Sequence, residues 1–176
     1  MYHGYNAANN ATSCCKWGRA NGWIMMGHVE VLEAVDKVSP HHELRDQLVQ
    51  LLNSHAAAML NVQDSSGAWH QVLNETDTFL ETSVTAMTMF SFARGIARGW
   101  LNKADYEASI HRAYAALVSQ VQDDGTVGKI CSGCGIQPNA ATYNTHSTDY
   151  EQSQPGLGSV WRAVVEYHNF VGGRHA

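Results

Sequence analysis

The amino-acid sequence predicts an all-α protein made of paired helices. Apolar residues recur at the spacing of one helix face in five separate stretches. Two similar loop sequences, 62–67 and 121–125, each follow the second helix of a pair, which gives a repeat of about 60 residues. Strand signals are weak and local, as in 68–73. Repeated helical hairpins that stack on one another explain this pattern best.

The first predicted helix covers 21–38 and the second follows directly. Ser39 is the expected N-cap of the second helix, and Pro40 is expected at its first helical position. The apolar face of the first helix carries Ile24, Val31, Val35 and Val38. The face of the second carries Leu44, Leu48, Leu51, Leu52, Met59 and Val62.

The third and fourth helices form the next predicted hairpin. The third covers 81–98 and ends at Gly99, and the fourth starts with Asn102 as its N-cap. Their apolar faces carry Val84, Met87, Phe90 and Ile96 in the third, and Tyr106, Ile110, Ala113, Tyr114, Leu117 and Val121 in the fourth. A loop over 128–155 and a helix over 156–170 make a third unit, without a second helix to pair with.

Length and composition favour one globular domain, residues 1–176. The chain has 176 residues, of which 44% are hydrophobic, and a net charge of −5 with ten histidines. The acidic balance argues against a nucleic-acid partner. No apolar run approaches the roughly 20 residues that span a membrane, so no membrane partner is expected. The N-terminus lacks the pattern of a signal peptide, which makes a cytoplasmic location the default expectation.

The four cysteines occur as two close pairs, Cys14–Cys15 and Cys131–Cys134. The second pair has the spacing of zinc ligands, and the first could complete a four-thiolate set. However, neighbouring cysteines hardly bind one ion together, and the interval between the pairs is longer than in zinc ribbons. Zinc ligation, a disulfide and free thiols remain open at this point.

The heptapeptide Trp17–Trp23 is the most distinctive stretch for function. It is expected to be a loop that runs into the first turn of a helix, where Gly18 and Gly22 let the backbone turn and let a ligand approach. Its two tryptophans offer apolar ring faces, and Arg19 offers a planar set of donors that suits a carboxylate. This combination is what an acidic sugar needs. The alternative is that the tryptophans anchor the core and Arg19 is a solvated charge.

Five separated motifs resemble glycoside hydrolase family 105, the unsaturated rhamnogalacturonyl hydrolases, which are related to family 88. The motifs are Trp-Gly-Arg-Ala-Asn-Gly-Trp at 17–23, Gly27, Gln-Asp-x-x-Gly-x-Trp at 63–69, Glu-Thr-Ser with Ala-Met at 81–87, and Cys-Ser-Gly-x-Gly at 131–135. The resemblance implies an (α/α)6 barrel, of which about three hairpins of the six are expected here. The chain is thus expected to be the C-terminal half of such a barrel.

The resemblance also implies the reaction. In this family one aspartate protonates the C4=C5 double bond of a terminal unsaturated galacturonate and delivers water to C5, after which the sugar ring opens and the glycosidic bond breaks. No aspartate of this chain matches that position in the pattern, so no catalytic residue is assigned. The aspartates concerned are Asp36, Asp46, Asp64, Asp77, Asp105, Asp123, Asp124 and Asp149.

The resemblance assigns the substrate-binding residues position by position. His3 matches the pocket histidine, Arg19 the pocket arginine, and Trp23 the stacking tryptophan. Trp17 is expected mainly to pack, and Trp69 is expected to cover the barrel mouth or to pack beneath its loop. Residues 81–83 start a barrel helix, where a capping role and a ligand role are both open.

The expected function is therefore hydrolysis of unsaturated galacturonyl-rhamnose oligosaccharides from pectin, with this chain as the substrate-holding half. A non-catalytic uronate-binding half-barrel is the alternative, and a zinc-stabilised interaction module is a third. The expected partners are an unsaturated uronic-acid oligosaccharide and either a second copy of the chain or a missing N-terminal half. A missing N-terminal segment would make secretion the expectation instead. No cofactor or metal is expected.

Overall fold

The computed structural model describes residues 1–148 and 156–174, and within them the chain is helical with three short β-ladders. The helices are α1 (Gly18–Val38), α2 (Arg45–Leu60), α3 (Thr82–Ala97), α4 (Lys103–Val118), α5 (Ala140–Asn144) and α6 (Leu157–Val171). The strands are β1 (Tyr5–Asn6), β2 (Ala11–Thr12), β3 (Trp69–His70), β4 (Leu80–Glu81), β5 (Ile130–Cys131) and β6 (Ser147–Thr148). Each ladder is antiparallel and two-stranded, pairing β1 with β2, β3 with β4, and β5 with β6.

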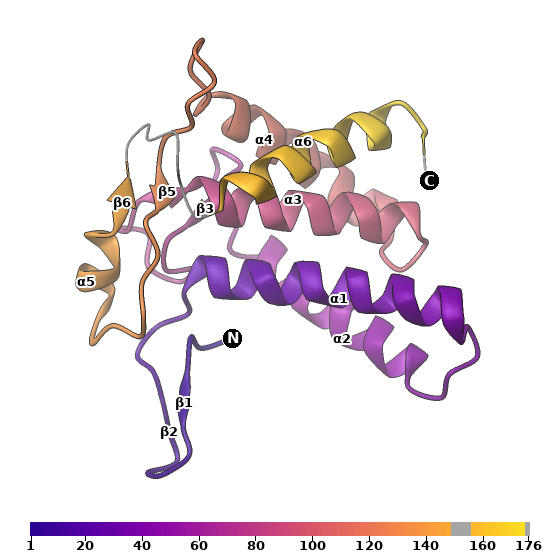
Figure 1. The fold of residues 1–176 in the computed structure, drawn as a ribbon, viewed down its shortest axis with the longest axis horizontal. Helices are drawn as coiled ribbons and strands as arrows, with labels where there is room; N and C mark the ends of the chain where they lie inside the picture. Colours follow the sequence, from indigo (N-terminus) through magenta and orange to yellow (C-terminus); the bar gives the residue numbers. More distant parts are fainter. Residues whose placement is uncertain (149–155, 175–176) are drawn as a thin grey trace.

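The long helices form two layers (Figure 1). Helices α1, α3 and α6 lie side by side and run in the same direction, while α2 and α4 lie behind them. Helix α3 is central because it packs against α1, α4 and α6. The strands and most loops gather at the end of the molecule where α1, α3 and α6 begin. That end of the three helices therefore carries the irregular segments from which a site can be built.

The core lies between the two layers. It includes Met87, Phe90 and Phe92 of α3, together with Leu52 of α2 and Ile110 of α4. Nearly every residue of α3 is buried, which fits a helix flanked by three others. None of the helices in the described parts of the chain is long and apolar enough to cross a membrane.

The all-α prediction is confirmed, and so are three of its helices. The predicted bounds of α3 and α6 agree with the structure to within one residue, whereas α4 ends at Val118, before Val121 of its predicted apolar face. Asn102 caps α4 as predicted, because its side chain accepts a hydrogen bond of 3.1 Å from the backbone N–H of Ala104.

The two loops with similar sequences, 62–67 and 121–125, also share a turn. In each of them an aspartate, Asp64 or Asp124, accepts a hydrogen bond from a backbone N–H two residues later.

The predicted start of the first helix is wrong. Helix α1 begins at Gly18, so most of the heptapeptide is helical rather than loop. Gly18 and Gly22 serve close packing instead of a turn. A Cβ atom at Gly22 would lie 2.7 Å from the sulfur of Met87 on α3, and one at Gly18 would lie 2.8 Å from the carbonyl oxygen of His70. The glycines thus let α1 approach the neighbouring chain segments closely.

The predicted start of the second helix is also wrong. Helix α2 begins at Arg45, so Ser39 and Pro40 lie in the connection before it, and Leu44 is its N-cap without a side-chain hydrogen bond. Leu44 and Leu51 are exposed, whereas Leu52 and Met59 are buried. The apolar face of α2 is therefore narrower than predicted. The one-turn helix α5 and the ladders β1–β2 and β5–β6 had no predicted counterpart.

Three predictions stay untested. They are that 1–176 is a single domain, that the chain is the C-terminal half of a barrel, and that it associates with itself or with another half. Asp149 and the end of the predicted loop up to Pro155 lie outside the described residues.

Candidate functional site

Three residues that were predicted to bind substrate, His3, Trp17 and Arg19, come together at the start of α1. They meet the start of α3 and the segment around β5 and α5. The ring centroid of Trp17 lies 4.4 Å from that of His3 and 5.8 Å from the guanidinium carbon of Arg19. The site therefore joins parts of the chain that are more than 100 residues apart in sequence.

Arg19 is buried, with only 4% of its surface exposed. Its Nε donates to the hydroxyl of Ser83 at 2.8 Å, and its Nη2 donates to the Glu81 carboxylate at 3.4 Å. The same Nη2 donates to the backbone carbonyl of Cys131. No partner of Nη1 is found among the described residues. Arg19 is thus held in one orientation by these partners, and the alternative of a solvated charge is excluded.

Glu81 holds this arrangement together. It is fully buried and is the N-cap of α3, where it accepts hydrogen bonds from the backbone N–H groups of Ser83 and Val84. It also accepts a 2.9 Å hydrogen bond from the backbone N–H of Cys131. A buried carboxylate is tolerated when it is paired and fully hydrogen-bonded, and Glu81 meets both conditions. Of the two roles left open for residues 81–83, the structure shows capping by Glu81.

Trp17 is almost completely buried, and its indole N–H donates to the side-chain oxygen of Gln71 at 3.1 Å. The side-chain nitrogen of Gln71 donates in turn to the sulfur of Cys131 at 3.1 Å and to the carbonyl of Tyr143 at 3.2 Å. Trp17 is therefore fixed by a hydrogen-bond network as well as by packing.

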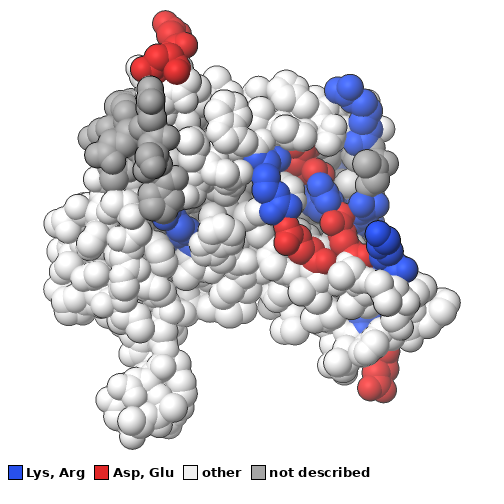
Figure 2. Space-filling view, viewed as in Figure 1, with Lys and Arg blue, Asp and Glu red and all other residues white. Residues whose placement is uncertain are grey.

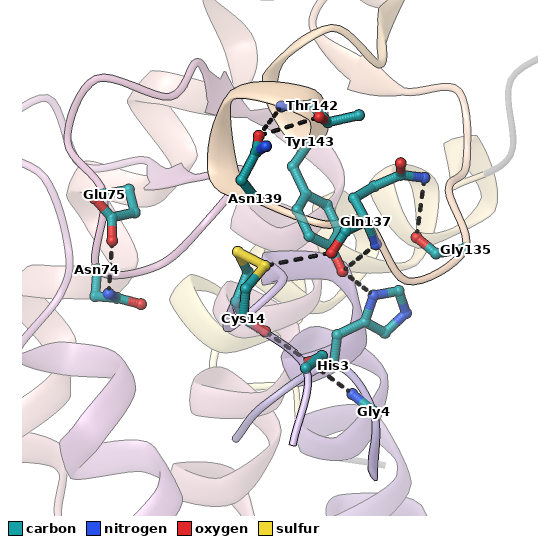
Figure 3. Close-up of a disulfide and its surroundings, with 12 residues drawn as sticks. His3, Gly4, Cys14, Asn74, Glu75, Gly135, Gln137, Asn139, Thr142 and Tyr143 are labelled. Carbon is teal, nitrogen blue, oxygen red and sulfur yellow. Dashed lines mark hydrogen bonds between the residues drawn. A yellow bond between two sulfur atoms is a disulfide. The ribbon is translucent and has the colours of Figure 1, made fainter. Parts of the chain in front are cut away.

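His3 reaches the same cluster from the N-terminal segment (Figure 3). Its Nδ1 lies 2.5 Å from the hydroxyl of Tyr143, and its backbone N–H donates to the carbonyl of Cys15 at 2.9 Å. Partial burial lowers the pKa of His3 from its ordinary value. A neutral imidazole is therefore the expected form at neutral pH, so His3 is suited to hydrogen bonding rather than to charge pairing.

The two remaining predicted residues lie in different surroundings. Trp23 is 54% exposed, on α1 one turn beyond Arg19, so its ring is free to contact a ligand. Trp69 is fully buried, and its indole N–H donates to the carbonyl of Met59 at 2.7 Å. Of the two alternatives for Trp69, the structure shows packing beneath the loop and no exposure at a pocket mouth.

Sequence reasoning missed Gln71 and Tyr143. Both are uncharged residues in or next to loops, and each acts through a partner that is distant in sequence. No local pattern marks such residues. Glu81 and Ser83 were noted in a motif of the resembling family with a capping or a ligand role, but the pairing of Glu81 with Arg19 was not predicted.

The cysteines divide into a disulfide and two thiols. Cys14 and Cys15 are bonded to each other, so they cannot supply thiolates to a four-cysteine zinc site. Cys131 is a buried thiol and Cys134 a half-buried one. Within residues 1–148 and 156–174, no group of three or more His, Cys, Asp or Glu side chains is placed to hold a metal ion.

The cluster can therefore position a polar ligand through hydrogen bonds and aromatic surface. Glu81 is the carboxylate found in it among the described residues, and its oxygens already accept hydrogen bonds from Ser83, Val84 and Cys131. A carboxylate so engaged is poorly placed to exchange protons with a substrate. Glu81 thus acts as a hydrogen-bond acceptor and ion-pair partner within the cluster.

The chain is similar to known carbohydrate-active proteins. The family model described as Glycosyl Hydrolase Family 88 matches residues 1–171. The unsaturated rhamnogalacturonyl hydrolase YesR of Bacillus subtilis is 32% identical over 149 residues, which cover 81% of this chain and 39% of YesR. An unsaturated 3S-rhamnoglycuronyl hydrolase of Formosa agariphila is 27% identical over 128 residues, covering 72% of this chain and 33% of that protein.

A solved structure of a related enzyme has the same fold. A family 105 glycoside hydrolase of C. acetobutylicum superimposes with a TM-score of 0.85 at 26% identity, covering 96% of this chain and 52% of that one. The chain thus spans well under two thirds of the length of these relatives. The expectation of a six-hairpin glycosidase fold is confirmed, because a solved family 105 enzyme shares this fold. The chain belongs to the related glycosyl hydrolase families 88 and 105.

Proposed function

We propose that this chain contributes the substrate-holding part of a hydrolase that acts on unsaturated uronyl oligosaccharides. Family membership supports the class of substrate, since relatives with related sequences bear the names of unsaturated rhamnogalacturonyl and rhamnoglycuronyl hydrolases. Unsaturated galacturonyl-rhamnose from pectin is the proposed substrate because the most extensive of these matches is to the rhamnogalacturonyl enzyme.

The observation that carries the proposal is the meeting of His3, Trp17 and Arg19. In this proposal the Nη1 of Arg19, which has no partner among the described residues, binds the uronate carboxylate, and His3 donates or accepts a hydrogen bond at a sugar hydroxyl. Trp23 is exposed one helical turn from Arg19 and supplies a ring face for stacking on the sugar. Trp17 keeps Arg19 and His3 in place.

The reaction requires a carboxylic acid that gives a proton to a ring carbon and takes one from water. Proton transfer by a positioned group contributes about 10²–10⁴-fold to such reactions. Glu81 is occupied by its hydrogen bonds, and no aspartate of this sequence matches the catalytic position of the resembling family, so the acid is proposed to come from a segment that this sequence does not contain. By itself, the 176-residue chain is then expected to bind but not to turn over.

The alternative is a non-catalytic uronate-binding protein, and one observation favours it. Arg19 is nearly enclosed and already paired with Glu81, which is the geometry of a structural ion pair. Turnover separates the two candidates, because only the first gains activity when it is completed by a segment that carries the acid.

The experiment uses the unsaturated galacturonyl-rhamnose disaccharide. Titration calorimetry of the purified chain is expected to show binding, and the ultraviolet absorbance of the 4,5-double bond is expected to stay constant. Co-expression with an N-terminal half of a family 105 enzyme is expected to make the absorbance fall. Decay with the chain alone would contradict the missing acid, and absence of binding would contradict the assigned site.

A further inference from the structure

Two free thiols lie next to Arg19, Cys131 at the end of β5 and Cys134 in the segment that follows it. The sulfur atoms of Cys131 and Cys134 are 3.8 Å apart. Two residues, Ser132 and Gly133, separate the cysteines, and this Cys-x-x-Cys spacing is found in dithiols that close to a disulfide. Gly133 has a φ of 101°, in the region that favours glycine, and nothing lies within 4 Å of a Cβ atom built on it. The connecting turn therefore has room to change shape.

Cys131 connects the predicted site residues. Its carbonyl accepts a hydrogen bond from Arg19, and its backbone N–H donates to Glu81 at 2.9 Å. Its sulfur accepts the 3.1 Å hydrogen bond from Gln71, which also holds the indole of Trp17. A change in the position of Cys131 thus acts on both Arg19 and Trp17.

Cys134 is the more accessible of the two sulfurs, since it is half-buried whereas Cys131 is fully buried. Burial is the main reason why the pKa of Cys134 is raised to about 12. The nearby Cys131 and Glu81 contribute to this increase, whereas Arg19 acts in the opposite direction. Tyr143 is a further titratable group near these thiols. At neutral pH the thiolate is rare, so any reaction of this pair is slow until the pH rises.

We propose that Cys131 and Cys134 form a reversible disulfide, a modification site whose state controls how Arg19 is held. The effect on uronate binding rests on the proposed function, whereas formation of the disulfide does not.

The oxidant is a low-molecular-weight disulfide such as oxidised glutathione. The Cys134 thiolate attacks one sulfur of glutathione disulfide, which forms a mixed disulfide and releases one glutathione thiolate. The Cys131 thiolate then attacks the Cys134 sulfur and releases the second glutathione. The two cysteines lose two electrons and two protons, and the oxidant becomes two molecules of glutathione.

Closure brings the two sulfurs from 3.8 Å to the length of a disulfide bond, about 2.05 Å. Since Cys131 has its hydrogen bonds to Gln71, Glu81 and Arg19, moving it weakens part of that set. Loss of one such hydrogen bond corresponds to about threefold to tenfold in affinity. The oxidised chain is therefore expected to bind a uronate more weakly than the reduced chain.

The first measurement is chemical. The purified full chain is incubated with oxidised glutathione at several pH values between 7 and 9.5, quenched with acid, and mapped by peptide mass spectrometry. The expected result is a peptide linking Cys131 to Cys134, formed about tenfold faster for each pH unit. Thiols that stay free at pH 9.5, or that pair with Cys14 or Cys15, would overturn the proposal.

Two single-serine variants serve as controls for disulfide formation. Cys131→Ser and Cys134→Ser each keep one partner of the pair, so each is expected to stop at a mixed disulfide or to remain unreacted. An internal crosslink in either variant would show that another cysteine is the true partner.

The second measurement is binding of the unsaturated disaccharide by the reduced and oxidised chains. We expect weaker binding after oxidation, reversed by dithiothreitol, and no effect of the oxidant on the Cys131→Ser/Cys134→Ser double variant. Equal affinity of the two forms would overturn the coupling to Arg19. If neither form binds, the proposed function fails, while the crosslink result stands on its own.

Discussion

Arg94 of α3 and Glu166 of α6 form a two-point ion pair. The Arg94 Nε lies 2.9 Å from one carboxylate oxygen of Glu166, and its Nη2 lies 2.6 Å from the other. The Nη1 of Arg94 contacts Glu33 of α1 at 2.7 Å, so one guanidinium joins all three helices of the layer. Figure 2 shows basic and acidic side chains gathered in one cluster on this face, with further charged groups toward its edges. The cluster also includes Arg98 with Glu33, and Arg162 with Glu30.

We expect Glu166→Gln to reduce the free energy of unfolding by about 1–2 kcal/mol, because it removes a charge-assisted hydrogen bond from a largely buried position. Urea unfolding at pH 7 measures this change. The control is Glu107→Gln, which disrupts an exposed pair with Lys103 on α4 and is expected to change stability by less than about 0.5 kcal/mol. Equal effects of the two substitutions would contradict the assigned role of the Arg94–Glu166 pair.

Two glycines of α1 form a matched pair for a packing test. A Cβ atom at Gly22 would lie 2.7 Å and 2.9 Å from atoms of Met87, whereas nothing lies within 4 Å of one at Gly27. Gly22→Ala is therefore expected to destabilise the chain by about 1–3 kcal/mol through overpacking. Gly27→Ala is expected to stabilise it by about 0.5–1 kcal/mol, because alanine favours a helix over glycine.

Thermal unfolding of both alanine variants measures these changes in stability. The melting temperature should fall for Gly22→Ala and rise for Gly27→Ala. A rise in both would mean that α1 and α3 are farther apart than the structure shows.

The same glycines explain why part of the fold could not be predicted. Helices α3, α4 and α6 were found because each has a periodic apolar face and because Asn102 marks a start. The start of α1 was missed because Gly18 and Gly22 resemble a turn in the sequence. Only the close approach of Gly18 to the carbonyl of His70 and of Gly22 to Met87 shows why both are glycines. The start of α2 was missed because Pro40 permits a helix start without requiring one.

The charged and aromatic residues of the candidate site were predicted, but the hydrogen bonds and the ion pair that join them were not. His3, Trp17 and Arg19 carry recognisable chemistry within a resembling motif, so they could be named. Whether Arg19 is exposed or buried depends on Glu81 and on the carbonyl of Cys131, which is 112 residues away. Such long-range pairing has no signature in a single sequence.

His55 makes stability depend on pH. The ring is buried, neither of its nitrogens has a partner among the described residues, and its pKa is lowered from 6.5 to about 4. Burial is the main cause, followed by the positive charges of the amino terminus and of His28. Between pH 6.5 and 4 the unfolded chain therefore binds a proton that the folded chain does not, so folding is favoured less as pH falls.

The expected loss is at most about 3 kcal/mol between pH 7 and pH 4. Urea unfolding of wild type and of His55→Gln across this range isolates the contribution, because the other titrating groups are common to both chains. The variant should show the shallower dependence on pH. His41→Gln, at an exposed position, serves as the control and should follow wild type. Parallel curves for wild type and His55→Gln would contradict the prediction.

The last prediction separates the structural role of Arg19 from its proposed role in binding. Arg19→Ala leaves Glu81 buried without its cationic partner, so we expect a loss of about 3–5 kcal/mol in the free energy of unfolding. A loss of uronate affinity in that variant then has two explanations, lost stability or a lost contact.

The double variant Arg19→Gln/Glu81→Gln removes both charges while keeping side chains that hydrogen-bond to each other. The amide that replaces the Glu81 carboxylate has only one acceptor oxygen for the backbone N–H groups of Ser83, Val84 and Cys131, so we expect a loss of about 1–3 kcal/mol. This loss is smaller than that of Arg19→Ala because no unpaired charge is buried. The affinity of the double variant for the unsaturated disaccharide should still fall about tenfold or more, since the charge-assisted contact to the carboxylate is lost. Urea unfolding and titration calorimetry on the two variants, with Arg112→Gln as an exposed arginine control, measure both quantities. If the double variant is stable and binds like wild type, Arg19 serves only the ion pair with Glu81, and the uronate site must lie elsewhere.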